Sequence, residues 1–353
     1  MPGMLAAYVS GHGYGHLVRL CEVLRRVREL APGLSIAVTG QVPEALVRRE
    51  IADPLELRPE PCDAGLAQRD ALEIDEAGTL ERCRAFDLGW EGRARREAAR
   101  LRAQGAGLVL ADIPALAFEA AALAGVPAVG LGNFTWSWIY SHLAARLPGL
   151  RDSAERAARA YARGELLLEL PFAGDLSEFR RREKVGFVAR RARVGREEAR
   201  RRLGIADGPL ALVSFGGVGL PALRPGAIEP DPDVRYLFPE QLPEPRLEEL
   251  GLRYPDVVAA ADVVVTKPGY GIVTDAIAGG ARIVYTDRGD FPEYPIMVRE
   301  MPAYVGCVHL AGADLRAGRL RAAVHRALAT PMPPRPDLEG ADRAARRLLE
   351  LLR

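Results

Sequence analysis

The chain has 353 residues, 48% of them hydrophobic, which is more than one ordinary core needs and enough for two domains. Its 48 Lys and Arg residues nearly balance its 47 Asp and Glu residues, so no overall charge attracts a nucleic acid or an anionic membrane. The four cysteines form no Cys-x-x-Cys pair, which argues against a zinc ribbon or a disulfide framework and favours a reducing cytoplasm.

Short apolar runs alternate with longer runs of helical period in the first half of the chain, which predicts parallel strands joined by crossover helices. The predicted strands are residues 5–10, 34–39, 54–58, 108–111, 128–131 and 166–170. The predicted helices are residues 17–30, 44–49, 85–104, 115–124 and 153–163. We therefore expect one doubly wound, Rossmann-like domain over residues 1–175. The longest apolar stretch, residues 107–132, contains acidic residues and prolines, so we expect no membrane span.

The second half of the chain repeats the alternation after a break. Residues 171–184 lose the apolar period and predict a linker between domains. A second Rossmann-like domain is expected over residues 185–338, and a final helix in residues 340–353 is expected to pack back on the first domain. The predicted elements of the second domain are strands at 210–215, 234–238, 263–266 and 283–286 and a helix at 270–278.

The first predicted strand is followed by a glycine-rich loop made of Gly11, His12, Gly13, Tyr14 and Gly15. The glycines let a ligand approach the backbone, and the N-terminus of the next helix offers free N–H groups. The loop lacks the third glycine of the dinucleotide fingerprint, because His16 stands there, and no acidic residue follows the second strand. A nicotinamide enzyme is therefore not expected.

Asp112 directly follows a predicted strand, so we expect it at the same sheet edge as the glycine loop. A carboxylate there can orient His16 as a general base for a hydroxyl group. The alternatives are that Asp112 caps the helix near Pro114 and that His16 is a capping or packed histidine. His12 and His16 have the spacing of helical metal ligands, but the glycines between them argue against a helix, so no metal is expected.

A second glycine turn, in residues 266–275, leads from a predicted strand into a predicted helix. The turn at Gly269, Tyr270 and Gly271 can seat a diphosphate on the helix N-terminus, and Asp275 can accept hydrogen bonds from ribose hydroxyls. The alternative is an ordinary strand–turn–helix connection, in which glycine is common.

Two further features of this domain favour an anionic ligand. Ser214, Gly216 and Gly217 form another such turn, which faces the same cleft if the sheet is doubly wound. Lys267 precedes the first turn and is one of only two lysines in an arginine-rich chain. A compact ammonium can approach a diphosphate where a wider guanidinium cannot.

Two other patterns carry less weight. Asp231-Pro232-Asp233 resembles an Asp-x-Asp metal motif of another transferase fold, but it lies in a proline-rich loop, and we discount it. The aromatic stretch 134–140 is more typical of a core than of a site, although it can also line an acceptor pocket.

Taken together, these motifs resemble the inverting glycosyltransferases of the GT-B fold, which have two Rossmann-like domains facing a cleft. The residues that match this family are the base His16, its partner Asp112, the diphosphate turn at Gly269 and Gly271, the ribose acid Asp275 and the sugar-binding acid Asp290. Two positions depart from the family pattern. Lys267 replaces the usual histidine and Gly271-Ile272 the usual Asn–Ser pair, so a uracil nucleotide is not assured.

A narrower resemblance, which covers most of the chain, is to the N-terminal glycosyltransferase-like region of plant L-arabinokinases. It is carried by residues 9–16, 62–65, 133–136, 139–140 and 267–275. In that family the region is joined to a sugar kinase, whose glycine-rich nucleotide loop we do not find here. We expect Asn133 and Trp136 on the acceptor side, together with the loop at residues 11–15.

The sequence therefore predicts a cytoplasmic inverting glycosyltransferase with a nucleotide-sugar donor, most simply a UDP-sugar, and no obligatory metal or other cofactor. The expected partners are the donor and a small-molecule or glycan acceptor, without nucleic acid or integral membrane association. A separately encoded sugar kinase is a further candidate partner. The alternatives are a nucleotide-sugar epimerase on the same fold and a non-catalytic sensor of nucleotide sugars or sugar phosphates.

Overall fold

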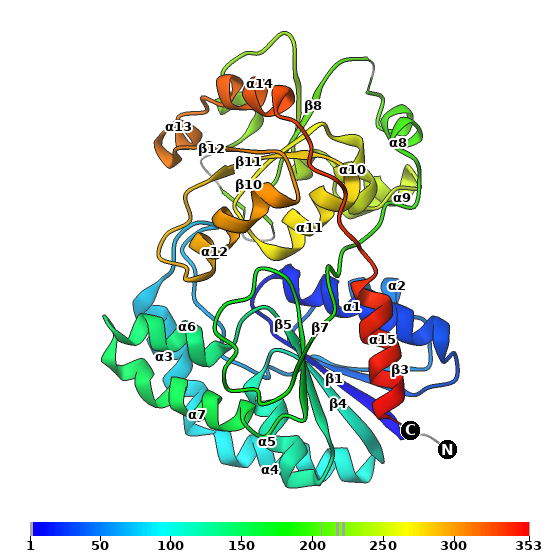
Figure 1. Cartoon of the computed structure of the whole chain (residues 1–353), viewed down its shortest axis with the longest axis vertical. Helices are drawn as coiled ribbons and strands as arrows, with labels where there is room; N and C mark the ends of the chain where they lie inside the picture. Colours follow the sequence, from blue (N-terminus) through cyan, green and yellow to red (C-terminus); the bar gives the residue numbers. More distant parts are fainter. Residues whose placement is uncertain (1–2, 206, 217–218, 221–222, 353) are drawn as a thin grey trace.

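The computed structural model describes residues 3–205, 207–216, 219–220 and 223–352, which form two lobes (Figure 1). The N-terminal lobe contains a parallel sheet of seven strands in the order β3-β2-β1-β4-β5-β6-β7. The C-terminal lobe contains a parallel sheet of five strands in the order β12-β11-β10-β8-β9. The strand order reverses between β1 and β4 and between β8 and β10. Such reversals are the points at which open α/β sheets bind ligands.

The N-terminal sheet follows the predicted strands closely. Its strands are β1 Met4–Val9, β2 Ile36–Thr39, β3 Leu55–Arg58, β4 Ala106–Asp112, β5 Ala128–Gly132, β6 Leu166–Glu169 and β7 Arg182–Lys184. Its helices are α1 Tyr14–Leu30, α2 Glu44–Glu50, α3 Glu76–Leu88, α4 Trp90–Ala103, α5 Ala115–Ala124, α6 Trp136–Ala144 and α7 Arg151–Tyr161. Strands β1 and β5 are buried along almost their whole length, which explains why their apolar runs are uninterrupted.

Two predictions for this lobe are corrected. The single helix predicted at 85–104 is two helices, because Gly89 ends α3 and precedes the first residue of α4. Residues 171–184, predicted as a linker, include β7, which pairs with β6 as an edge strand. This strand was missed because an exposed edge such as Arg182–Lys184 carries no apolar pattern. The chain leaves the N-terminal lobe only after Lys184.

The C-terminal lobe contains all four strands predicted for it. Its strands are β8 Leu210–Val213, β9 Arg235–Leu237, β10 Val263–Thr266, β11 Arg282–Thr286 and β12 Cys307–Leu310. Its helices are α8 Arg196–Arg202, α9 Glu244–Glu249, α10 Tyr254–Ala260, α11 Tyr270–Gly279, α12 Glu293–Glu300, α13 Gly312–Arg316 and α14 Arg321–Ala329. Of these elements, β12 and all the helices except α11 were not predicted from the sequence.

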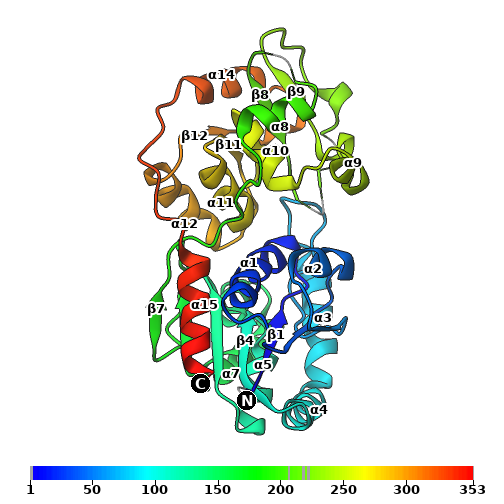
Figure 2. The same ribbon diagram turned by 90° about the vertical axis from the view of Figure 1, so that its right-hand side faces the viewer.

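The last helix, α15 (Gly340–Leu351), returns to the N-terminal lobe and lies beside α1 (Figure 2). Arg26 on α1 is 2.6 Å from Asp342, and Nε of Arg347 is 2.8 Å from Glu183 on β7. Both ion pairs hold α15 against the N-terminal lobe. None of the described helices is both long enough and apolar enough to cross a membrane.

The two lobes meet where α1 and α11 begin, and Figure 1 shows α11 and α12 on the side of the C-terminal lobe that faces α1 and α6. A side-chain carbon added to Gly271 would lie 3.5 Å from Cα of Gly15, an ordinary contact distance, so the two backbones lie close to each other here. An ion pair of 2.6 Å between Arg253 and Glu50 also joins the lobes. The N-termini of two helices, with their free N–H groups, therefore lie side by side.

Candidate functional site

His16 and Asp112 are in contact at the carboxyl edge of the first sheet. Strand β1 pairs with β4 so that Val9 lies opposite Asp112, which brings the loop after β1 to the end of β4. Nδ1 of His16 is 2.7 Å from Oδ1 of Asp112, and the Asp112 side chain is fully buried. Asp112 does not cap α5, since that helix has Pro114 at its N-cap and no side-chain cap bond. The alternative interpretation of Asp112 as a helix cap is therefore excluded.

Arg19 is a buried partner of Asp112 that sequence reasoning missed. Its Nε donates to Oδ2 of Asp112 and its Nη2 donates to Oδ1, both at 2.6 Å. Burial alone would raise the pKa of Asp112, but the charges of Arg19 and His16 and the bonds they donate lower it, so the carboxyl group is ionised. Because Arg19 lies three residues after His16 on α1, the helical spacing could have identified it.

The pairing continues from Arg19 into the C-terminal lobe. Nη1 of Arg19 donates to Oδ1 of Asn133 at 2.8 Å, and Nδ2 of Asn133 donates to Oε1 of Glu293 at 3.1 Å. Glu293 is the first residue of α12. Each side chain of this hydrogen-bonded network, which runs from His16 through Asp112, Arg19 and Asn133 to Glu293, is 9% exposed or less. The position of Asp112 thus depends on a side chain from the opposite lobe.

His12 lies beside the aromatic residues of the predicted acceptor side. Its ring contacts Trp136 edge-on with a centroid distance of 5.3 Å, and its Nδ1 is 3.2 Å from the backbone N of Leu66. Burial and the neighbouring charges of His16, Arg288 and Lys267 lower the pKa of His12 to about 3. The imidazole of His12 is therefore neutral where it contacts Trp136.

Trp136 connects this region to a carboxyl group that we had not assigned to the site. Its Nε1 donates to Oδ2 of Asp63 at 2.8 Å, and its ring stacks on Tyr140 with a centroid distance of 5.6 Å. Burial raises the pKa of Asp63. Gly11, Gly13, Tyr14 and Gly15 of the loop are exposed. The loop and the aromatic helix α6 thus surround one side of His16.

The predicted donor residues lie at the carboxyl edge of the second sheet. Oγ of Ser214 is 2.6 Å from the hydroxyl of Tyr254, and Gly216 is exposed with φ of +74°. Gly217 lies outside the described residues. Gly269 precedes α11, whose N-terminus has no side-chain cap. The Tyr270 hydroxyl accepts a hydrogen bond from the backbone N–H of Val188 at 3.1 Å.

The two predicted acids of the donor side already have partners. Asp275 is 3% exposed and forms an ion pair with Arg190, whose Nε is 3.3 Å from Oδ1. Asp290 is exposed, lies 2.8 Å from Nε2 of His142 on α6 and also pairs with Arg146. The structure therefore places Asp275 inside the C-terminal lobe and Asp290 at a surface contact between the lobes.

Lys267 is half-buried in the loop that directly follows β10. Burial lowers its pKa to about 7, and the positive charge of Arg288 contributes to the shift. Among the described residues, no carboxylate lies within ion-pair distance of Lys267. Its ammonium group is available for a ligand.

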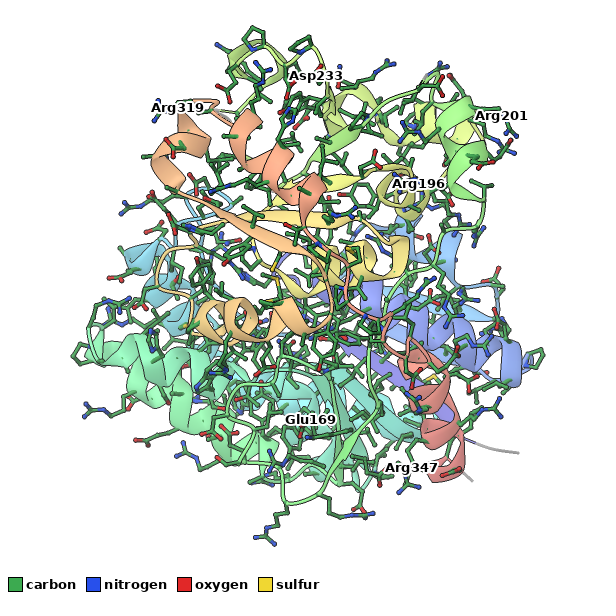
Figure 3. All side chains as sticks on the ribbon, turned by 45° about the horizontal axis from the view of Figure 1, so that its top comes forward. Glu169, Arg196, Arg201, Asp233, Arg319 and Arg347 are labelled. Atoms are coloured by element: carbon green, nitrogen blue, oxygen red, sulfur yellow. The ribbon has the colours of Figure 1, made fainter. Side chains whose placement is uncertain are left out.

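One group of side chains in the described part of the chain has the geometry of a metal site, and it lies outside the cleft. Ligand atoms of Asp231, Asp233 and His325 are within 4.8 Å of one another. Arg321 lies 3.7 Å from Asp231 and 3.6 Å from Asp233, so a cation already balances these acids. Figure 3 shows Asp233 at the end of the C-terminal lobe away from Arg347 on α15.

The chain is similar in sequence to one known kind of protein, an L-arabinokinase. No family model matches the chain. It is 30% identical over 345 residues to an L-arabinokinase of Arabidopsis thaliana, an alignment that covers 92% of this chain. The chain spans about a third of that protein, 32% of its length.

Solved structures of sugar transferases resemble the whole chain. A UDP-glucosyltransferase of Polygonum tinctorium able to glucosylate indoxyl is 14% identical, with a TM-score of 0.60 and coverage of 100% of this chain and 93% of that one. UGT2 of Phytolacca americana, complexed with UDP-2-fluoro-glucose and pterostilbene, is 10% identical, with a TM-score of 0.59 and coverage of 99% and 94%.

The chain has the GT-B fold. This confirms the predicted fold class and the predicted resemblance to L-arabinokinase. In this GT-B chain the switch point of the first sheet holds His16 and Asp112, and that of the second holds Ser214 and Lys267. The two switch points face each other where α1 and α11 meet.

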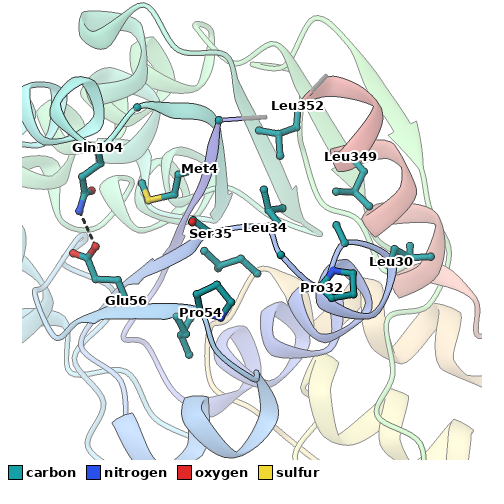
Figure 4. Close-up of a pocket in the computed structure, with 16 residues that line it drawn as sticks. Met4, Leu30, Pro32, Leu34, Ser35, Pro54, Glu56, Gln104, Leu349 and Leu352 are labelled. Atoms are coloured by element: carbon teal, nitrogen blue, oxygen red, sulfur yellow. Dashed lines mark hydrogen bonds between the residues drawn. The ribbon is translucent and has the colours of Figure 1, made fainter. Parts of the chain in front are cut away.

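A large open cavity of the GT-B chain lies elsewhere, at the amino end of the first sheet (Figure 4). Its volume is about 1130 Å³, and its lining includes Met4, Leu34, Pro54 and Leu352. Glu56 and Gln104 form a hydrogen bond of 2.7 Å at its edge. Because ligands of open α/β sheets bind at the carboxyl edge, this cavity is not the site described above.

Proposed function

We propose that this chain is an inverting glycosyltransferase that moves a sugar from a nucleotide diphosphate, most simply UDP, to an acceptor hydroxyl. The observation that carries the proposal is the buried contact between His16 and Asp112 at the edge where the lobes meet. The GT-B fold, shared with a structure that holds UDP-2-fluoro-glucose and pterostilbene, supports the class of substrate.

The proposed base is Nε2 of His16. In this mechanism Nδ1–H would donate to the ionised Asp112, and the neutral ring would carry its lone pair on Nε2, to which no described residue is hydrogen-bonded. Nε2 removes the proton of the acceptor hydroxyl as its oxygen attacks the anomeric carbon. The bond from that carbon to the diphosphate oxygen breaks on the opposite face, which inverts the configuration. Asp112 stabilises the resulting imidazolium.

The leaving diphosphate is proposed to lie at the N-terminus of α11. Lys267, the N–H groups of residues 269–271 and the segment at residues 214–216 would stabilise its charge, and the proposal invokes no metal. Asp275 would bind the ribose while it keeps its ion pair with Arg190. On the other side of His16, the loop at residues 11–15, Asn133 and Trp136 would contact the acceptor.

A binding panel followed by a product analysis tests the function. Thermal shift with UDP, GDP, ADP, dTDP and their glucose conjugates identifies the nucleotide, and NMR of the product of a labelled donor determines the anomeric configuration. We expect one nucleotide diphosphate to stabilise the protein and the product to be inverted. Binding of none of these nucleotides, or retention of configuration, would contradict the proposal.

A non-catalytic sensor is the second candidate, favoured by one observation. Both carboxylate oxygens of Asp112 already accept bonds from Arg19, which compensates the charge that should stabilise an imidazolium. A sensor would bind a nucleotide sugar or sugar phosphate without turnover and could act with a separately encoded sugar kinase. The free cysteines fit the cytoplasmic location proposed for either function.

A further inference from the structure

Arg288 is a buried cation without an acidic partner. It follows β11 and is 8% exposed. Its Nη1 donates to the carbonyl of Pro268 at 3.1 Å, and its guanidinium carbon lies 3.8 Å from the centroid of the Phe291 ring. Its Nε is buried and has no hydrogen-bond partner in the described structure. No described carboxylate lies within ion-pair distance of it.

Such a group is unfavourable in the ligand-free protein. Buried charges are normally paired, because the interior solvates a lone charge poorly. Burial accordingly lowers the pKa of Arg288, and Glu293 is the acid that opposes this shift. Glu293 accepts a hydrogen bond from Asn133 instead of pairing with Arg288. The protein retains a cation here that its own residues do not balance.

Lys267 brings a second cation to the same place. The carbonyl of Pro268, which Arg288 contacts, directly follows Lys267 and lies at the N-terminus of α11. The acids that act on Lys267 are Asp70 and Glu293, and Oδ1 of Asp70 accepts from the backbone N–H groups of Leu72 and Glu73. Two cations therefore lie beside the N-terminus of α11, which has no side-chain cap.

We propose that Arg288 and Lys267 form a binding site for a phosphate group. A guanidinium offers parallel N–H donors that match two oxygens of a phosphate, and Nε of Arg288 is such a donor without a partner. The partly exposed Lys267 contacts the phosphate from the cleft. Lys267 precedes α11, whereas Asp275 lies in the second turn of that helix, so the phosphate is assigned to the end of the ligand away from the ribose.

This site deepens the proposed function, since it rests on the same cleft. The phosphate has two possible sources, the terminal phosphate of a nucleoside diphosphate and the phosphate of a sugar 1-phosphate. UDP, UMP and glucose 1-phosphate separate them, because UMP lacks the terminal phosphate and glucose 1-phosphate lacks the nucleoside.

The experiment is calorimetry of these three ligands with wild type, Arg288→Met and Arg288→Lys. The control is Arg299→Gln, which changes an exposed arginine of α12 that pairs with Glu300 at 2.7 Å. We expect Arg288→Met to weaken UDP about 10- to 100-fold and UMP less than about threefold, as for a lost hydrogen bond to a charged group. Arg288→Lys should recover part of the loss, and the control should bind UDP as wild type does.

Thermal unfolding of the ligand-free proteins separates ligand binding from a structural role. Since Arg288 is unpaired, Arg288→Met should unfold at the wild-type temperature or above it. A clear fall in that temperature for both Arg288 variants, or equal affinity of wild type and Arg288→Met for UDP and glucose 1-phosphate, overturns the phosphate site.

Two results would distinguish this inference from the proposed function. If wild type binds glucose 1-phosphate but not UDP, and Arg288→Met loses that binding, the phosphate site stands and the transferase proposal fails. If Arg288→Met binds both phosphates as wild type does and still transfers sugar from the donor, the phosphate site is wrong and the transferase proposal stands.

Discussion

The histidine region of the N-terminal lobe and the cationic region of the C-terminal lobe differ in how their charges are balanced. Around Asp112 each charge has a partner within hydrogen-bond distance, from His16 and Arg19 through Asn133 to Glu293. In the cationic region, neither Lys267 nor Arg288 has an acidic partner among the described residues. A paired network keeps its geometry without a ligand, whereas unpaired cations need one.

The comparison assigns different tasks to the two lobes. A general base needs one orientation and one tautomer, which the buried bonds around His16 provide. A site for a phosphate instead needs unused donors, which Arg288 and α11 provide. Substitutions in the first region should therefore change turnover or stability, and substitutions in the second should change ligand affinity.

The largest effect is expected for His16→Ala. Turnover should fall by roughly 10²–10⁴-fold, the usual contribution of a general base, while UDP affinity stays nearly unchanged. Initial rates with saturating donor and calorimetry with UDP measure the two quantities. His309→Ala is the control, because that histidine is exposed and pairs with Asp287. Inactivity of His12→Ala together with normal activity of His16→Ala would assign the base to His12.

Arg19→Met should lower the free energy of unfolding by about 3–5 kcal/mol, because it leaves the buried carboxylate of Asp112 without its guanidinium partner. Urea denaturation measures this change. Arg25→Met, on the same helix but with a partly exposed side chain paired to Glu22, should cost less than about 1 kcal/mol. Equal stabilities of the two variants would show that the Arg19 pair is not a structural support.

Lys267→Ala should weaken the binding of UDP by about 1.5–3 kcal/mol without reducing the stability of the ligand-free protein. Lys267→Arg should restore the affinity only partly, because the guanidinium is wider than the ammonium. Calorimetry on both variants, with Lys184→Ala as the control lysine, gives the comparison. Wild-type affinity in both Lys267 variants would remove this side chain from the phosphate site.

The smallest effect is a pH dependence with two opposite signs. Burial and Arg288 lower the pKa of Lys267 to about 7 from 10.5. Between these values the unfolded chain binds more protons at this residue, so the ligand-free protein should become more stable as the pH rises from 7 to 10.5. UDP needs the protonated amine, so its affinity should fall by up to about tenfold per pH unit above 7.

Calorimetry and thermal unfolding between pH 7.5 and 9.5 test both signs, because the last phosphate proton is lost near pH 6 and the charge of UDP is then constant. The slope of UDP affinity should disappear in Lys267→Ala. A slope that persists in this variant would assign the titration to another group.

Much of the fold could be predicted because buried parallel strands leave a strong pattern. Strand β10 was predicted with the bounds it has, and α5 likewise, since apolar runs and glycine turns are local signals. The edge strand β7 and the short polar helix α8 were not predicted, because exposed elements carry no such runs.

The sequence by itself was enough to predict the fold class. It was also enough to predict that His16 lies at the sheet edge where Asp112 ends a strand. Only the tertiary structure decided that Arg19 shares this carboxylate, that Glu293 supports it from the other lobe, and that Arg288 remains unpaired. Asn133 and Glu293 are 160 residues apart in the chain, and their contact depends on how the lobes pack. Local patterns report burial and turns, whereas the partner of a buried charge is decided by packing between distant segments.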